Sequence, residues 1–492
     1  MAMSRVFLRF GSMRCSGRGG SSRTVGDCHT QRSDGPPLHG HAGCGILVVT
    51  DDVAEVGMPS RAWYDVAPSA SRLTRSLRDI GYEFPTAVAD IVDNSIAAGA
   101  SRVEIMVEYD GTDSCVVIAD DGRGMSPGQL QEALRFGTRR SYGHGELGRY
   151  GLGLKTASLS QCRALTVVTR SSKSTVRTCA RTLDLDVIDD WDQWVVVDPP
   201  SGDRWIQRAR QWLAEGTGTV VLWQALDRVL PEKRPEGGWA RRRLDSLATR
   251  TAEHLGIVFH RFLEEGSEGS QLVITVNGQK VSPWNPFALH EQATVALPGQ
   301  EFEIEVGGVV GRVHLRRYVL PSRDRFTSPA EFERLSGPMN WNRQQGLYVY
   351  RARRLVQWGG WGGIRGIDEH TKLARAALDF DTDLDSAFNI NVAKMRVVLP
   401  PQLRQMLEAP VNELRILADE AYRRNSHAEM RRMPADLAAP PEVRAVTQAA
   451  ATAGLALRTA AMQADAWPEW ERIEETLRRE SPEVARLLGL DA

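Results

Sequence analysis

Residues 87–98 read AVADIVDNSIAA, and the helix that they predict is the most informative element of the chain. At about 100° per residue, the larger apolar side chains gather on one side of this helix. The other side carries Asp90, Asp93, Asn94 and Ala97. It lacks the long Lys and Glu side chains that are typical of a solvated helix face. We therefore expect that this side is either an ordinary helix face with short side chains or a face against which a ligand lies.

Length and composition indicate a globular protein. The chain has 492 residues, 42% hydrophobic and 25% charged, enough for two or three domains. The formal net charge of -1 gives no overall indication of nucleic-acid binding. Two basic runs, Arg241-Arg242-Arg243 and Arg351-Ala352-Arg353-Arg354, are either local nucleic-acid contacts or solvated surface, and the second interpretation is favoured.

Cysteine usage and hydropathy suggest where the protein works. The six cysteines form no C-x-x-C pair, which predicts a reduced, cytoplasmic setting without structural zinc. No apolar run approaches ~18 residues, so we expect no membrane span. The first 57 residues are rich in Arg, Gly and Ser. They are a disordered leader, an organellar transit peptide, or an extension of the gene model upstream of a start near Met58.

The chain becomes regular from residue 70, with helices ahead of hairpin-like strands. Helices are expected at 71–82, 84–100 and 126–137, and strands at 101–111, 114–120 and 164–172. The glycine-rich segment 139–158 is expected to be a loop. This order favours an α/β sandwich over a parallel doubly wound sheet.

Four short patterns of the kind that bind nucleotides follow one another. In the helix, Asp90 and Asn94 are four residues apart and so lie side by side. DDGRGM at 120–125 places an acid at a strand end before a glycine turn. GRYGLGLK at 148–155 offers glycines whose backbone N–H groups can approach phosphates. GTGTV at 216–220 begins a later strand. Each alone is more often an ordinary face, turn or loop, but this ordered set is hard to obtain by chance.

The set resembles the gyrase, chaperone, histidine-kinase and MutL (GHKL) superfamily of ATPases. The segment GRYGLGLKTAS at 148–158 is most similar to the MORC-like branch. The resemblance implies a Bergerat-type α/β sandwich that binds ATP with Mg2+. It implies a metal ligand at Asn94, an acid at Asp120 that reads the adenine amino group, and the following nucleotide-binding residues: Ala98, Gly122, Gly124, Met125, Gly148, Tyr150, Gly151, Leu152, Gly153, Leu154, Lys155 and Thr219.

The same resemblance implies three catalytic residues. Asp90 would orient the attacking water, and Lys155 would stabilise charge on the γ-phosphate. Many members that hydrolyse ATP have Glu where this chain has Asp90, which is shorter by roughly 1.5 Å, and a misplacement of about 1 Å can cost ~10²-fold in rate. Asp93 is a less suitable second carboxylate because it is turned away from Asn94. Lys394 is either the lysine that reaches the γ-phosphate from the next domain or a surface lysine.

We expect three folded regions. An ATP-binding domain spans 70–265, and a βαβ transducer-like domain of the kind found in the MutL, gyrase and MORC branches spans 266–404. A helical tail follows at 405–492. The tail either mediates contacts with a second copy or a partner, or forms a helical cap on the transducer-like domain.

Two functions fit the resemblance. The first is a nucleotide-gated clamp, an ATP-dependent homodimer whose slow hydrolysis controls its grip on DNA or a protein client in genome maintenance or defence. The second is a non-hydrolysing ATP sensor or chaperone-like module that orders a protein-interaction surface. A histidine kinase is disfavoured because no membrane span or phosphoacceptor helix pair precedes the ATPase motifs.

Overall fold

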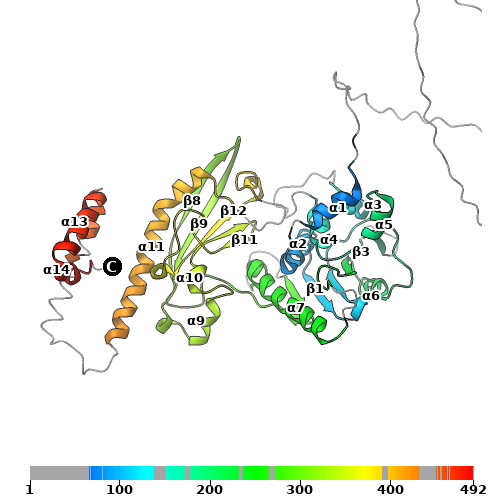
Figure 1. Cartoon of the computed structure of the whole chain (residues 1–492), viewed down its shortest axis with the longest axis horizontal. Coiled ribbons are helices and arrows are strands. Elements are labelled where there is room, and N and C mark those ends of the chain that lie inside the picture. Colours follow the sequence, from blue (N-terminus) through cyan, green and yellow to red (C-terminus); the bar gives the residue numbers. More distant parts are fainter. Residues whose placement is uncertain are drawn as a thin grey trace, which may run out of the picture. The chain divides into compact units, whose positions relative to one another are not determined.

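A computed structural model gives the architecture of the chain (Figure 1). It describes residues 66, 68–79, 81–137, 151–171, 178–231, 236–264, 272–390, 397–431, 450, 453–454, 457–462, 464 and 466–490. Two sheets account for the strands in these residues.

The first sheet has seven strands in the order β4-β3-β5-β2-β1-β6-β7. Its strands are β1 (Arg102–Glu108), β2 (Cys115–Asp120), β3 (Ala164–Arg170), β4 (Cys179–Asp184), β5 (Gly218–Gln224), β6 (Val273–Val276) and β7 (Gln279–Lys280). β1 and β6 pair in parallel, and the other neighbours pair antiparallel. In this order β5 lies between β3 and β2, which both precede it in sequence. The centre of the sheet is therefore completed only by a strand that comes late in the chain.

Helices cover both faces of the first sheet. The larger apolar core packs one face against α1 (Ala70–Arg78), α2 (Phe84–Ala97), α3 (Pro127–Leu134), α4 (Gly153–Leu159), α5 (Leu185–Trp191), α7 (Gly238–Val258) and α8 (His260–Leu263). α6 (Arg204–Trp212) covers the other face, where alternate residues of β2 and β5 are buried. The predicted α/β sandwich is therefore confirmed.

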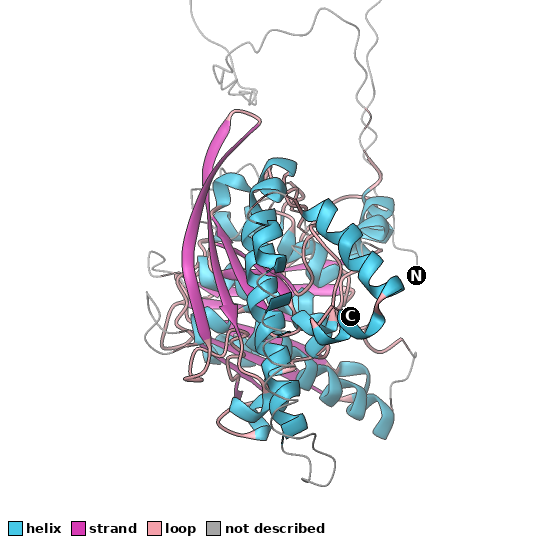
Figure 2. Cartoon of the chain, turned by 90° about the vertical axis from the view of Figure 1, so that its left-hand side faces the viewer, coloured by secondary structure: helices cyan, strands magenta, loops and turns pink. Residues whose placement is uncertain are grey.

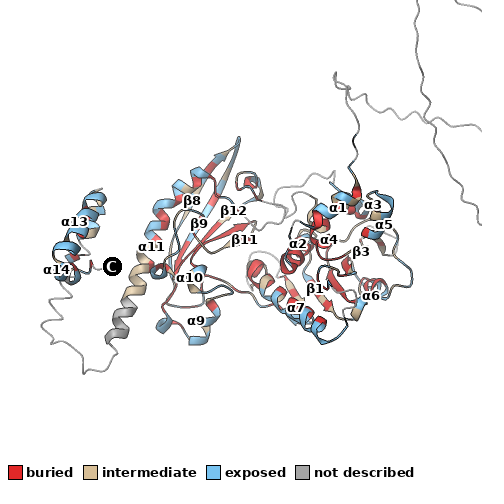
Figure 3. Cartoon of the chain, in the orientation of Figure 1, coloured by how far each residue is buried: buried red, intermediate tan, exposed pale blue. Residues whose placement is uncertain are grey.

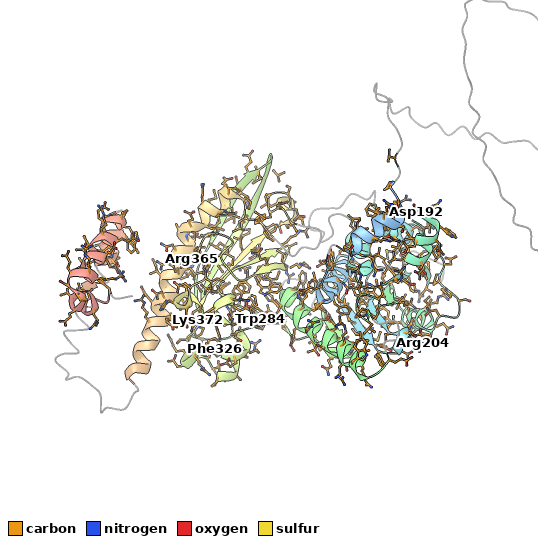
Figure 4. All side chains as sticks on the ribbon, viewed as in Figure 1. Asp192, Arg204, Trp284, Phe326, Arg365 and Lys372 are labelled. Carbon is orange, nitrogen blue, oxygen red and sulfur yellow. The ribbon has the colours of Figure 1, made fainter. Side chains whose placement is uncertain are left out.

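Local sequence explains the ends of the helices near the site. Pro85 occupies the first turn of α2, where its missing N–H costs nothing. Gly99 follows the end of α2 with a φ of 74°, a conformation that favours glycine. At α1, Ser69 donates to Asp192 at 2.7 Å and its hydroxyl accepts from Arg72 N–H. Figure 4 labels Asp192 beside α1.

The second sheet has five strands in the order β11-β10-β12-β9-β8. They are β8 (Val295–Val306), β9 (Val309–Val319), β10 (Gly346–Arg351), β11 (Arg354–Trp358) and β12 (Ala374–Phe380). β10 and β12 pair in parallel, and the other neighbours pair antiparallel. The short helices α9 (Pro329–Leu335) and α10 (Trp341–Gln344) lie between β9 and β10 in sequence.

The long helix α11 (Pro401–Arg431) packs on this second sheet (Figure 2). Its buried residues Leu403, Leu407, Val411 and Leu414 recur at helical spacing and belong to the core of the sheet. The first part of the predicted tail is thus part of the second core. Helices α13 (Trp467–Glu480) and α14 (Pro482–Leu487) form an apolar cluster of their own around Trp470.

Two details differ from the sequence expectation for the second region. β6 and β7 pair with the first sheet, so that sheet ends at Lys280, later than the expected boundary at 265. The parallel strands β10 and β12 are joined through β11 and a short 3-10 turn at Glu369–Thr371 rather than through an α-helix.

Two further observations concern cysteines and hydropathy. Among the residues that the structure describes, Cys115, Cys162 and Cys179 are free thiols. No helix in the described parts of the chain has the length and apolar character that a membrane crossing requires.

Candidate functional site

α2 carries the first predicted site residues and is buried on nearly all sides (Figure 3). Its residues from Phe84 to Asp93 are all buried. Asn94 is exposed, and Ala97 and Ala98 are partly exposed. The polar side of the helix is therefore not one surface, since its two acids face protein and its amide faces outward.

Asp90 lies at the meeting point of three segments. The phenol of Tyr82 donates to its Oδ2 at 3.0 Å. A Cβ built on Gly153 would lie 3.8 Å from the same oxygen and would meet no other atom within 4 Å. Nη2 of Arg354 lies 3.6 Å from Oδ1. The carboxylate is thus held beside the first residue of α4, within the glycine-rich segment.

Asp93 is part of a buried ion pair. Nε of Arg354 donates to its Oδ1 at 2.9 Å, and both side chains are nearly inaccessible to solvent. This pairing explains the carboxylate without a ligand, and no local pattern in the sequence indicates it.

Asp120 ends β2 and is 6% exposed. Its Oδ2 accepts from the hydroxyl of Ser95 at 3.0 Å, and its Oδ1 accepts from the N–H of Gly122 at 2.9 Å. Burial raises the pKa of this carboxyl, while these hydrogen bonds oppose the shift. Ser95 lies on α2, so it joins the first sequence pattern to the second.

The glycine turn after Asp120 packs directly on neighbouring strands. A Cβ on Gly124, whose φ is 63°, would lie 1.9 Å from the carbonyl oxygen of Arg170. A Cβ on Gly218, whose φ is 151°, would lie 2.0 Å from the carbonyl oxygen of Asp120. These contacts require glycine and bring the fourth pattern against the second.

Gly122, Met125 and Thr219 complete this part of the site. A Cβ on Gly122 would lie 2.8 Å from the Cβ of Ala98. Met125 N–H donates to Thr169 Oγ1 at 2.9 Å, and that hydroxyl lies 3.1 Å from Thr219 Oγ1. Thr219 is also the strand partner of Asp120. The predicted adenine-pocket residues are therefore neighbours in space.

Part of the predicted phosphate lid lies within the described residues. Gly151 has a φ of 62°, Leu152 caps α4, and Gly153 and Leu154 form its first turn. Gly148, Tyr150 and Lys394 lie outside the described residues, so their predicted roles stay predictions.

Lys155 is buried and faces α3 rather than open space. Its side chain is 1% exposed, and Nζ donates to the carbonyl oxygen of Ala133 at 2.8 Å. Burial lowers its pKa to about 8. To contact a phosphate, this amine would have to exchange the carbonyl for the ligand.

The site offers few protein ligands for a metal ion. Among the described residues, no group of three or more His, Cys, Asp or Glu side chains is placed to hold one. Mg2+ is commonly held by one or two protein oxygens together with phosphates and water. The exposed amide of Asn94 fits a magnesium–nucleotide complex of that kind.

Four contacting residues were absent from the sequence prediction. They are Tyr82, Ser95, Thr169 and Arg354. Ser95 directly follows Asn94 in the helix, so its placement on the same turn was a usable indication. The others depend on long-range packing, and Arg354 in particular was assigned to a basic surface run. That assignment is wrong for Arg351 and Arg354, which are each 2% exposed and paired with carboxylates.

A comparison with protein families fits this geometry. Residues 82–212 match the family described as histidine kinase-, DNA gyrase B-, and HSP90-like ATPase. These residues belong to the GHKL superfamily. The matched range includes α2, the Asp120 turn and the start of α4, so the GHKL domain contains three of the four sequence patterns.

Proteins named DNA mismatch repair protein MutL are similar to part of this chain. The protein from Rhodospirillum rubrum is 36% identical over 90 residues, which cover 18% of this chain and 14% of the relative. The protein from Halobacterium salinarum is 40% identical over 90 residues, covering 17% of this chain and 13% of the relative. The similarity thus spans about a seventh of the length of the curated relatives. Neither comparison bears on the narrower MORC-like resemblance.

Proposed function

We propose that this protein binds ATP with Mg2+ in the GHKL domain and hydrolyses it slowly. The proposal is carried by the convergence of the four sequence patterns. Ser95 bonds Asp120, Gly153 lies beside Asp90, and Gly218 packs on the Asp120 carbonyl. Residues separated by more than a hundred positions therefore surround one site.

Each binding role follows from chemistry already described. Asp120 keeps acceptor capacity beyond its bonds to Ser95 and Gly122, which suits it to accept from the adenine amino group. Asn94 would supply an amide oxygen to Mg2+. The metal, when bound, supplies charge neutralisation on the phosphates. The backbone of Gly151 and Gly153 would line the phosphates, as the superfamily resemblance implies.

In the proposed hydrolysis, Asp90 accepts a hydrogen bond from the attacking water. As the water oxygen bonds to the γ-phosphorus, the bond to the β–γ bridging oxygen breaks, and the water proton passes to Asp90 and then to the released phosphate. Tyr82 holds the other side of the carboxylate. Lys155 would approach the γ-phosphate after leaving the carbonyl of Ala133.

We further propose that nucleotide gates a homodimeric clamp that acts on DNA or a protein client in genome maintenance or defence. The relatives named as mismatch-repair proteins support a DNA-associated role. A second candidate is a non-hydrolysing ATP sensor or chaperone-like module. It is favoured by one observation, that Asp90 is already contacted by Tyr82 and Arg354.

ATP binding is tested by a pair of adjacent substitutions. Asp120→Asn should weaken affinity for Mg-ATP roughly 10- to 100-fold, the equivalent of one hydrogen bond to a charged group. Asp121→Asn is the matched control because the carboxylate of Asp121 accepts hydrogen bonds from Ser101 and Arg102. Isothermal titration calorimetry measures both. Equal affinities in the two variants would contradict the adenine role of Asp120.

Hydrolysis and the metal ligand are tested separately. Asp90→Ala should lose phosphate release while keeping affinity for a non-hydrolysable ATP analogue. Asn94→Ala should lose the part of the affinity that depends on Mg2+. If Asp90→Ala still hydrolyses ATP, Asp90 is not the residue that orients the water. If the wild-type protein does not hydrolyse ATP at all, the non-hydrolysing sensor is favoured.

The clamp is tested by sedimentation and DNA binding. With the non-hydrolysable analogue, sedimentation should detect a dimer, and a monomer at high concentration would favour the sensor. DNA affinity measured across a salt titration should depend on the analogue and fall steeply with salt, because phosphate contacts release counterions.

A further inference from the structure

Arg354 of the second sheet contacts the helix that carries the proposed base. It is the first residue of β11, and its side chain is 3% exposed. Its Nε donates to Asp93 Oδ1 at 2.9 Å, and its Nη2 lies 3.6 Å from Asp90 Oδ1. One guanidinium therefore faces two buried carboxylates from adjacent turns of α2.

The turn that presents Arg354 has an unusual backbone. Ala352 and Arg353 link Arg351 of β10 to Arg354 of β11, with φ values of 44° and 71°. Two-residue hairpin turns with both φ values positive usually use Asn and Gly. A strained backbone persists only where its surroundings determine it, and such sites are often functional.

Contacts on three sides hold this turn. They are Ala352 N–H to Phe380 O at 3.0 Å, Arg353 Nη2 to Arg261 O at 2.9 Å, and Arg351 to both carboxylate oxygens of Asp385 at 2.6 and 2.7 Å. The position of Arg354 is thus fixed by the second sheet and not only by the acids that it meets.

Among the described residues, the rings that lie around Arg354 provide no second positive charge for Asp90 and Asp93. Burial, together with the charge of Arg354, lowers the pKa of His254 to about 4, so this imidazole is neutral at pH 7. Its ring lies 6.0 Å from that of Trp358 on β11. The guanidinium of Arg354 lies 5.8 Å from the ring centroid of Phe259. The apolar rings strengthen the electrostatic interaction between Arg354 and the carboxylates by excluding water.

We propose that Arg354 is a positioning residue for Asp90, with Asp93 as the anchor that holds its guanidinium beside that carboxylate. The inference rests on the proposed function of Asp90 as the residue that orients water. Tyr82 fixes Oδ2 and Arg354 faces Oδ1, so the short side chain is located from both sides. Hydrolysis then depends on the β10–β11 hairpin although Arg354 touches no reacting atom.

The test compares two buried arginines of the second sheet. Arg354→Lys keeps the charge but loses the planar group that faces both acids. Arg317→Lys is the matched control because Arg317 is an equally buried arginine of β9 whose pair with Glu413 involves neither this turn nor α2. Single-turnover hydrolysis, affinity for a non-hydrolysable ATP analogue and thermal unfolding are measured on the full chain.

Arg354→Lys should lower the hydrolysis rate roughly 10- to 100-fold, because small misplacements of a reacting group have effects of that size. Analogue affinity should stay unchanged, and Arg317→Lys should keep both the hydrolysis rate and the analogue affinity of the wild type. Equal rate losses in the two variants would show a merely structural role and overturn the inference. An unchanged or faster rate in Arg354→Lys would overturn it too.

Two further variants keep the test decisive. If Arg354→Lys does not fold, Asp93→Asn removes the anchor charge with little change in shape, and it should show the same rate loss with retained affinity. An unchanged rate in Asp93→Asn would then overturn the inference. Asp90→Asn separates the two proposals. If Asp90→Asn keeps turnover, the proposed role of Asp90 as the base is wrong. If Asp90→Asn loses turnover while the Arg354 and Asp93 variants keep it, only the proposed role of Arg354 is wrong.

Discussion

Tyr82 donates a hydrogen bond to Asp90 Oδ2 at 3.0 Å from a position that is itself buried. Burial and the charge of Asp90 raise the pKa of the phenol, so it stays protonated and remains a donor. Tyr82→Phe should lower turnover and reduce the free energy of unfolding by about 1.5 to 3 kcal/mol. Tyr109→Phe, which loses the bond from Gly237 N–H and leaves Tyr82 in place, is the control for phosphate release and urea unfolding. Unchanged turnover in Tyr82→Phe would mean that the phenol does not locate Asp90.

Gly153 provides a substitution that fills space without a clash. The methyl group of Gly153→Ala would lie 3.8 Å from Asp90 Oδ2, which is ordinary contact. Alanine at this helix position should raise the free energy of unfolding by up to about 1 kcal/mol. The methyl group would nevertheless occupy the space where a water would bind Asp90, so we expect turnover to fall. Turnover and thermal unfolding measured together check this, and wild-type turnover would place the water elsewhere.

Gly218 and Gly216 differ sharply in what a side chain would meet. Gly218→Ala would bring a Cβ within 2.0 Å of the Asp120 carbonyl oxygen, whereas a Cβ on Gly216 meets nothing within 4 Å. Gly218→Ala should destabilise the domain by several kcal/mol, as expected where the backbone conformation excludes the new residue. Gly216→Ala should behave like wild type. Urea denaturation measures the stability of both variants. Equal denaturation midpoints for Gly218→Ala and Gly216→Ala would contradict the close packing of Gly218.

Lys155 predicts a pH dependence of stability. Its pKa is about 8 in the folded protein, below its ordinary value of 10.5, so between these pH values the unfolded chain binds more protons. The free energy of unfolding should therefore rise with pH across this window, by up to about 3 kcal/mol at about 1.4 kcal/mol per pKa unit. Below pH 8 the buried ammonium opposes folding. Lys155→Met should lack this rise in the free energy of unfolding. If the pH profiles of the variant and the wild type run parallel, Lys155 is not the source of the pH dependence.

The same amine predicts proton uptake on binding. A phosphate near Lys155 would raise its pKa, so Mg-ATP binding near pH 8 should take up protons. Calorimetry in buffers with different ionisation enthalpies measures this uptake. Lys155→Met should show less uptake than wild type, and an identical value would place Lys155 away from the phosphates.

Local patterns in the sequence predicted the elements whose structure is set locally. α2 was expected at 84–100 and spans Phe84–Ala97, and Gly99 follows its end with a positive φ. The turn between β6 and β7 is likewise set locally, because Asn277-Gly278 is a strong hairpin signal and both residues have positive φ values. Helix periodicity and turn chemistry act over a few residues, so one sequence contains enough information for them.

Elements that depend on distant packing escaped the sequence analysis. β12 reads ARAALDF and was assigned no element, because Ala and Leu favour helices. It is a strand since it lies between β10 and β9, where nearly all of its residues are buried. Arg354 likewise looked like surface, yet its partner Asp93 is 261 residues away. Such pairs are fixed by topology, which periodicity does not reveal.

The position of β5 has a consequence for the synthesis of the chain. β5 joins β2 to β3, but it follows Asp120 by nearly a hundred residues and lies beyond residue 212, where the family match ends. At a translation rate of ~5–20 residues per second, roughly 5 to 20 s separate the emergence of β2 from that of β5. During this interval the nascent chain exposes unpaired edges of β2 and β3. We therefore expect chaperones to bind ribosome-attached chains that stop near residue 212 and to release those that extend past Lys280.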